Sequence, residues 1–335
     1  MAVTIEDIKK LRTMTGAGMK DCKKALTEAD GDIKKAVELV RERGLAIAAK
    51  RSDRTTSNGC VLVKNENGFA AMIGLKCETD FVANGADYIK LTQDILDAAI
   101  AAKAHTLDEV KELTVSYDGE DVKVADAVTR RSGVVGEKME LDGYNVLEGD
   151  NIYTYDHMGR HTLCTMVQLS AANEDAGHKV AMQVAAMKPV ALDEASVPQN
   201  VKDEELKVAI EKTKEEQIQR QVNVALKKAG INANLVDSDD HIASNVTKGW
   251  LTQEDADKAR EIIKTVGAEA AGKLNENMIQ NIAKGRMAKF YKENCLVDQE
   301  FQFEEGDKKN VAQWLDAQAK GLKVVAYKRY TLAAD

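Results

Sequence analysis

The first 44 residues carry three short apolar stripes at helical spacing, separated by breaks rich in Gly and Asp. Thr15-Gly16-Ala17-Gly18 follows the first stripe and Asp30-Gly31-Asp32 the second, so the pattern predicts three helices. Thr4 and Asp7 form a capping-box-like start for the first helix, and Gly44 is predicted to end the third as its C-cap. The stripes are Ile5, Ile8 and Leu11; Met19, Cys22 and Leu26; and Ile33, Ala36, Val37 and Val40.

From Cys60 onward the spacing of apolar residues changes from helical to alternating, which predicts strands. A hairpin turn is expected at residues 65–68, where Gly68 supplies the positive φ that a tight turn needs. A helix follows, and the same order of hairpin and helix recurs around Gly159, 91 residues after Gly68. The pattern therefore predicts two related halves in an α+β fold. The expected strands are 69–75, 152–155 and 163–169. The apolar stripe of the first helix is Tyr88, Leu91, Ile95, Leu96 and Ala99, and the second helix is expected around residues 180–187.

Beyond Pro198 the chain becomes highly charged. Residues 201–229 and 252–290 carry a sparse apolar stripe under a charged face, which indicates two long antiparallel helices that project as a coiled coil. Residues 230–251 are expected to form its tip. The segments predicted after the coiled coil are a strand at 300–303, a helix at 311–319 and a strand at 324–331, which return to the second sheet.

A chain of 335 residues, 44% hydrophobic and 30% charged, is long enough for two or three domains of roughly 100–200 residues each. Pro189 and Pro198 are its only prolines, so long helices are permitted almost everywhere. The predicted domains are a three-helix domain at 1–52 with a linker to about 57, a first core subdomain at 58–145, a second at 146–198 with 291–335, and a helical coiled-coil insertion at 199–290.

Charge and cysteine usage limit the function classes. The net charge of −8 disfavours a general nucleic-acid binder, whose affinity comes from neutralising phosphates. Residues 1–54 hold 13 Lys/Arg against 9 Asp/Glu, a net +4 that leaves −12 for the rest, and a basic domain on an acidic body suits a protein partner. The N-terminus lacks the basic-then-apolar order of a signal peptide. No apolar run approaches the roughly 18 residues that a membrane span needs. The five scattered cysteines form no Cys-x-x-Cys pair, which argues against a disulfide framework or a zinc site. We therefore expect a cytoplasmic protein without membrane contact.

Motifs of catalysis and cofactor binding are missing from the sequence. It holds no Gly-x-x-x-x-Gly-Lys-Ser/Thr, no Gly-x-Gly-x-x-Gly and no Gly-x-Ser-x-Gly. Residues 15–18 look like a phosphate loop only superficially, because they lie between helices without a preceding strand. His157 and His161 are four apart, a metal-binding spacing on a helix, but they straddle the predicted hairpin. We therefore expect no enzyme activity, no cofactor and no metal site.

Residues 77–83, Cys-Glu-Thr-Asp-Phe-Val-Ala, are the most informative segment, because a buried strand stops there and a helix begins. Phe81 stands beside Asp80 in a chain with few aromatic residues. The local pattern favours a structural role, in which Thr79 or Asp80 caps the helix and Phe81 packs beneath it. The alternative is an outward-facing functional pair, since loops on a rigid scaffold often carry function.

Several segments together resemble the translation elongation factor Ts family. They occur in family order and at family-like spacing over most of the chain outside the long helical region. That region is longer here than in the shorter members, and the extra C-terminal helix of some members is missing. The matching segments are residues 11–26, which resemble the N-terminal ubiquitin-associated-type domain; 79–83, which resemble the core motif; and 185–189 and 285–290, which resemble segments flanking the coiled coil.

The resemblance implies a guanine-nucleotide exchange factor for elongation factor Tu, which promotes GDP release without making or breaking bonds. It implies that Asp80 and Phe81 enter the GTPase domain of this partner near its Mg²⁺ site, and that Thr79 and Val82 shape the insertion.

The resemblance also implies that the N-terminal domain docks on the same GTPase domain through Arg12, Met19 and Lys23. The hairpin with His157 and Met158 is expected to reach another domain of the partner. Two alternatives stay open: an adaptor that binds peptides through its ubiquitin-associated-type domain, and a ribosome- or RNA-binding factor. A homodimer through the helical insertion also stays open.

Overall fold

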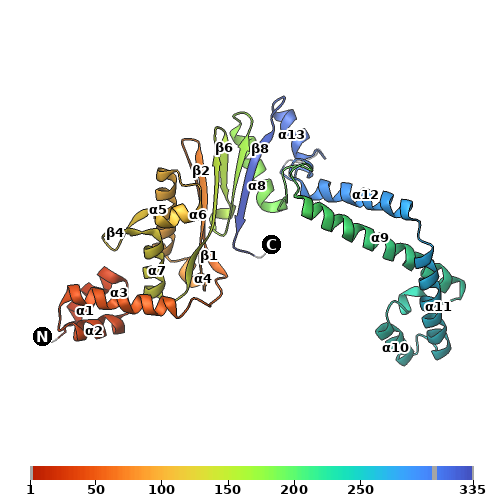
Figure 1. Cartoon of the computed structure of the whole chain (residues 1–335), viewed down its shortest axis with the longest axis horizontal. Coiled ribbons are helices and arrows are strands. Elements are labelled where there is room, and N and C mark those ends of the chain that lie inside the picture. The colour runs from red at the N-terminus through yellow and green to blue at the C-terminus, as the bar shows by residue number, and fades with distance from the viewer. Residues whose placement is uncertain (1–2, 304–307, 334–335) are drawn as a thin grey trace. The chain divides into compact units, whose positions relative to one another are not determined.

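The computed structural model describes residues 3–303 and 308–333. The chain forms two compact units, one of Met1–Leu192 with Gln299–Asp335 and one of Asp193–Asp298. Figure 1 labels most of their helices and several strands. Helices combine with small antiparallel sheets, so the expected α+β class is confirmed. Among the described residues, no helix is long and apolar enough to cross a membrane.

Three helices, α1 (Ile5–Thr15), α2 (Met19–Glu28) and α3 (Ile33–Ala49), form the N-terminal bundle. The predicted capping box is confirmed: Thr4 Oγ1 accepts the Asp7 N–H at 3.1 Å, and the Asp7 carboxylate accepts the Thr4 N–H at 3.1 Å. Ile5 and Met19 of the predicted stripes are exposed, since each stands at the first position of its helix. The buried residues of the bundle are Ile8, Leu11, Ala17, Cys22, Ala25, Leu26, Ala29, Ala36 and Val40.

The prediction that Gly44 ends the third helix is wrong. α3 continues to Ala49. Gly44 is buried against Gly133 of α7 (Val124–Val135), where a Cβ on Gly133 would collide with the Gly44 backbone. This close helix contact accounts for a glycine inside a helix, where it costs about 1 kcal/mol relative to Ala.

The first half of the core is a three-stranded sheet in the order β1-β2-β5 with its covering helices. Its hairpin turns at Asn67 and Gly68, whose φ values of 51° and 80° are those of the predicted tight turn. The predicted stripe of α5 is buried against this sheet. The alternating pattern did not reveal the third strand or the short elements before it. The elements are β1 (Asn58–Glu66), β2 (Phe69–Cys77), α4 (Asp80–Ala83), α5 (Ala86–Ala102), α6 (Leu107–Glu112), β3 (Thr114–Tyr117), β4 (Glu120–Lys123), α7 and β5 (Met139–Glu148).

The second half of the core repeats the plan, with a sheet in the order β6-β7-β8 and one covering helix. The hairpin of β6 and β7 turns through a short 3₁₀ segment, η1. The prediction that residues 324–331 return to this sheet is confirmed, since β8 pairs antiparallel with β7. The elements are β6 (Ile152–Asp156), η1 (His157–Gly159), β7 (Leu163–Leu169), α8 (Glu174–Met187) and β8 (Val324–Thr331).

The predicted strand at residues 300–303 is wrong. Among the described residues, the segment forms an isolated bridge between Glu300 and Asn310. Phe301 instead stacks on Trp314 of α13 (Val311–Gln318), with ring centroids 3.9 Å apart and planes inclined by 18°. The segment is apolar because it covers a helix, and not because it joins a sheet.

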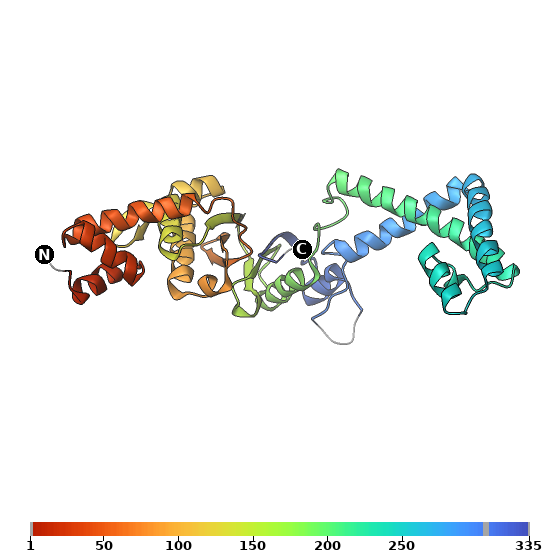
Figure 2. The same cartoon turned by 90° about the horizontal axis from the view of Figure 1, so that it is seen from below.

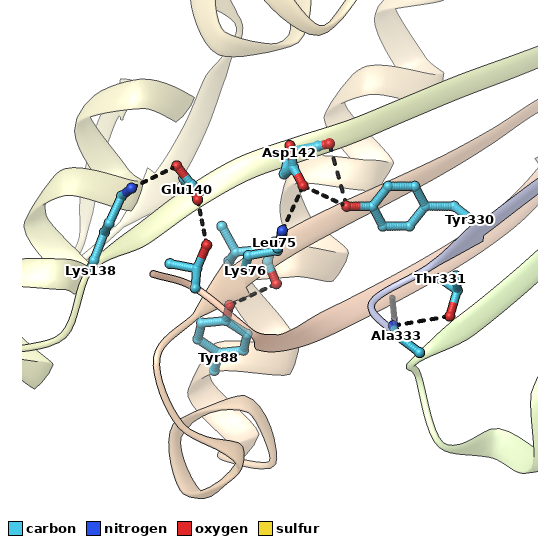
Figure 3. A network of polar contacts seen from close by, with 10 residues as sticks. Leu75, Lys76, Tyr88, Lys138, Glu140, Asp142, Tyr330, Thr331 and Ala333 are labelled. Atoms are coloured by element: carbon cyan, nitrogen blue, oxygen red, sulfur yellow. Dashed lines mark hydrogen bonds and ion pairs between the residues drawn. The ribbon is translucent and has the colours of Figure 1, made fainter. Parts of the chain in front are cut away.

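Tyr330 of β8 joins the two halves, and Figure 3 shows its polar partners. Gly74 and Gly143 face each other across β2 and β5, and a Cβ on either would collide with the Tyr330 ring. The Tyr330 hydroxyl donates to Asp142 Oδ2 at 3.2 Å, and Lys76 Nζ lies 2.9 Å from the same oxygen. The glycine pair therefore forms a slot in the first sheet that the ring of the second half occupies.

The unit Asp193–Asp298 is built of helices. In Figure 2, the green α9 (Gln199–Lys228) is followed by a tip and by a return arm of two helices. The prediction of one return helix over 252–290 is wrong, because the arm breaks at residues 273–275. There Asn275 caps the second helix by accepting the Met278 N–H at 3.0 Å. The remaining elements are η2 (Ala233–Leu235), α10 (Asp239–Thr247), α11 (Gln253–Gly272) and α12 (Glu276–Asn294).

Candidate functional site

The segment after β2 presents Phe81 to solvent. Thr79 has extended backbone, with φ −122° and ψ 153°, and caps the one-turn helix α4 by accepting the Val82 N–H at 3.4 Å. Phe81 is 87% exposed, whereas Val82 and Ala83 are buried in the core of the first half. Thr79 thus fills the capping role that the pattern predicted, but the expectation that Phe81 packs beneath the helix is wrong.

Side-chain hydrogen bonds hold the three backbone carbonyls that precede Phe81. The buried Cys77 thiol donates to the Thr79 carbonyl at 3.2 Å, and burial raises the pKa of this thiol. Asn84 Nδ2 donates to the Asp80 carbonyl at 2.9 Å. Asn58 of β1 donates to the Glu78 carbonyl at 2.9 Å. Phe81 therefore stands on a backbone whose neighbouring carbonyls are bonded, which fixes the direction of its side chain.

Two carboxylates, one within the segment and one outside it, tie the segment to residues 137 and 138. Glu78 accepts the Lys138 N–H at 2.7 Å and Arg51 Nη1 at 3.1 Å, and these contacts lower the pKa of its carboxyl group. Glu137 accepts the Thr79 N–H at 3.0 Å and the Thr79 hydroxyl at 2.7 Å. Neither glutamate was among the predicted site residues. Nothing in a local pattern links positions 60 residues apart, although Gly136-Glu137-Lys138 does mark a turn.

The residues predicted on the N-terminal bundle are exposed. Arg12 lies on α1, and Met19 and Lys23 lie on α2. Met14 of α1 is a further exposed apolar side chain that the helical spacing did not single out. The buried cluster of this bundle is separate from the cluster that holds Val82.

The hairpin tip of the second half presents Met158, which has φ 56° and is 66% exposed. His157 is half-buried, and its Nδ1 lies 3.1 Å from the Tyr155 hydroxyl. His161 Nδ1 lies 2.5 Å from Asp156 Oδ2, so the two histidines have different partners. In the part of the chain that the structure describes, no group of three or more His, Cys, Asp or Glu could hold a metal ion.

Comparison with known proteins gives one consistent family. The family described as elongation factor TS matches residues 78–237 and 221–334. The chain is 59% identical to the elongation factor Ts of Bacteroides fragilis, 56% to that of Parabacteroides distasonis and 39% to that of Porphyromonas gingivalis, in each case over the whole length of both chains. The long helical unit is therefore shared with these relatives. The chain belongs to the elongation factor Ts family of translation elongation factors.

Proposed function

We propose that this protein promotes the release of GDP from elongation factor Tu, and that the segment carrying Asp80 and Phe81 is the part that acts. The observation that carries the proposal is the 87% exposure of Phe81 on a capped, hydrogen-bonded turn. A large apolar side chain held in water by rigid backbone is ready to be buried in a partner. As a translation factor, the protein would act in the cytoplasm.

The physical mechanism needs no bond chemistry. Mg²⁺ bridges the phosphates of a bound nucleotide to the GTPase, so moving it removes a large local charge interaction. Asp80, which is exposed beside Phe81, would bring a negative charge to that site. Burial of Phe81 would supply roughly 1.5–3 kcal/mol, and each ~1.4 kcal/mol taken from nucleotide binding lowers its affinity tenfold.

The remaining exposed residues would set where the protein docks. In this proposal Arg12, Met19 and Lys23 bind the GTPase domain, and His157 and Met158 reach another domain of the partner. Val82 would anchor the turn from within the core. Because coupling between two ligands is reciprocal, nucleotide that rebinds must weaken the hold of the exchange factor on its partner. The factor is then released and acts again.

The test is the release of a fluorescent GDP from elongation factor Tu, chased with unlabelled GDP. We expect the protein to accelerate release strongly, and Phe81→Ala to reduce that acceleration at least tenfold, as the loss of Phe burial implies. Val208→Ala removes another exposed apolar side chain, on α9, and serves as the matched control with wild-type activity. Wild-type acceleration by Phe81→Ala would refute the insertion mechanism.

A further inference from the structure

In both halves of the core, a side-chain hydrogen bond joins the residue after the second strand to the residue before the third strand. Glu78 is the first residue after β2, and its carboxylate accepts the N–H of Lys138, the last residue before β5, at 2.7 Å. Ser170 is the first residue after β7, and its hydroxyl accepts the N–H of Lys323, the last residue before β8, at 3.1 Å. This bond, which we term the shared clamp, joins the second strand to the third in each half.

Among the residues that the structure describes, a second clamp is present in the first half and has no counterpart in the second. Thr79 follows Glu78, and Glu137 precedes Lys138, and these two residues are joined by a backbone and a hydroxyl hydrogen bond of 3.0 and 2.7 Å. The equivalent positions in the second half are Ala171 and the buried Leu322, whose side chains have no polar group. The extra clamp therefore lies at one of the segments where the halves differ, the turn that carries Phe81.

Glu137 itself stands on a rigid support. Gly136 ends α7 with φ 76°, and its N–H donates to the Ser132 carbonyl at 2.8 Å. The buried Ser132 hydroxyl donates to the Glu137 carbonyl at 2.5 Å. α7 is held in turn against α3 by the contact of Gly133 with Gly44. The backbone of Glu137 is thus tied to the helix that packs on the N-terminal bundle.

We propose that Glu137 is a positioning residue for nucleotide exchange, because its carboxylate holds Thr79 so that α4 directs Phe81 at the partner. The proposal rests on the function proposed above. α4 has four residues, too few for a helix to be stable without support. Both Glu137 oxygens are charged acceptors, which make the stronger class of hydrogen bond. Without them Thr79 loses two bonds, and the cap of α4 is no longer fixed.

The experiment compares Glu137→Ala with Ser170→Ala, which removes the shared clamp of the second half and leaves the turn intact. Release of fluorescent GDP from elongation factor Tu is measured over a range of exchange-factor concentrations. For Glu137→Ala we expect the maximal release rate to fall about tenfold, with the half-saturating concentration within about twofold of wild type, because the docking residues are unchanged. For Ser170→Ala we expect both parameters to stay near wild type.

Two further measurements separate positioning from a general loss of stability. In the Phe81→Ala background, Glu137→Ala should have less than about a twofold further effect, because the two residues act through one turn. Hydrogen exchange of the free protein should show the amides of residues 79–82 exchanging about tenfold faster in Glu137→Ala than in wild type. That second readout does not involve the partner.

The outcomes distinguish the two proposals. A wild-type maximal rate for Glu137→Ala, together with a loss for Phe81→Ala, overturns the role of Glu137 and leaves the exchange function standing. Equal losses for Glu137→Ala and Ser170→Ala also overturn it, since they indicate general destabilisation. No acceleration by the wild type refutes the exchange function; unchanged hydrogen exchange at residues 79–82 would then refute the positioning role as well.

Discussion

The two halves of the core build the same hairpin, covering helix and third strand, yet they present different ends to solvent. In the first half, β2 and α5 are joined by residues 78–85, and this connection contains α4 and the exposed Phe81. In the second half, residues 170–173 join β7 directly to α8. The hairpin tips also differ. The first half has a tight turn at Asn67 and Gly68, whereas the second half has a longer tip that exposes Met158.

The difference teaches where a repeated fold can be modified without losing its core. The shared clamp after the second strand is kept in both halves, with Glu78 in one and Ser170 in the other. The exposed side chains of Phe81 and Met158 are not part of this clamp. Phe81 lies in the strand-to-helix connection of the first half, and Met158 lies at the hairpin tip of the second. In the proposed mechanism the acting residues lie in these connections, whose side chains are not needed for the sheet.

The largest expected effect concerns the contact that Tyr330 makes between the halves. Tyr330→Ala would empty the slot between Gly74 and Gly143 and remove the hydrogen bond to Asp142, at a cost of about 3 kcal/mol. We expect a lower midpoint in urea with the helix content unchanged. Tyr330→Phe keeps the ring and should lose about 1 kcal/mol or less. An unchanged midpoint for Tyr330→Ala would mean that the halves are stable without this contact.

A smaller loss of stability is expected from Gly133→Ala. The added Cβ collides with the backbone of Gly44, and such overpacking costs typically 1–3 kcal/mol. Gly136→Ala serves as a comparison with a different cause, because a Cβ there meets no atom but the φ of 76° is unfavourable. Thermal unfolding measures both. If Gly133→Ala were as stable as wild type, α3 and α7 would not need the close approach described above.

The hairpin tip should matter less for exchange than the turn of the first half. Met158→Ala removes an exposed side chain that faces water in the free protein, and we expect about a threefold weaker binding to elongation factor Tu, less than the loss for Phe81. The maximal release rate should not change. Titration of the release rate against exchange-factor concentration measures both quantities. A larger loss for Met158→Ala than for Phe81→Ala would reverse the proposed division of roles.

The smallest effect is a pH dependence of the shared clamp. Because the pKa of Glu78 is lowered in the folded state, its contribution to stability is complete above its unfolded pKa of about 4.3 and is lost as the pH falls through the folded value. The stability difference between wild type and Glu78→Gln should be constant from about pH 7 to 5 and shrink below about pH 4. The cost of Ser170→Ala should not depend on pH in this way, because a hydroxyl does not titrate there. Urea titrations at several pH values provide the measurement.

The sequence predicted most of the fold where the apolar pattern was strong and local. The strands 163–169 and 324–331 and the turn at Gly68 were predicted at their observed positions. Within residues 103–148, α6, β3 and β4 were not predicted, because they are too short to develop a period. Gly44 was misassigned, since a sequence does not distinguish a glycine that ends a helix from one that admits a neighbour.

The candidate site was harder to predict from the sequence pattern than the fold was. An aromatic residue next to buried positions favours a core role, and only the structure revealed that Phe81 faces water while Val82 faces the core. The family resemblance supplied the site residues. Glu137 escaped prediction because its importance depends on a hydrogen bond to Thr79 across 58 residues of chain.

The placement of β8 has a consequence for biosynthesis. Residues 170–323, including the whole unit Asp193–Asp298, lie between β7 and β8, the strand that pairs with the edge of β7 opposite β6. A chain emerging from the ribosome can therefore fold its helical unit while β7 still has an unpaired edge, a state that is open to wrong strand pairing. Only when Tyr330 arrives can the slot in the first sheet be filled. We expect nascent chains that end before β8 to be recognised by chaperones, and complete chains to be released from them.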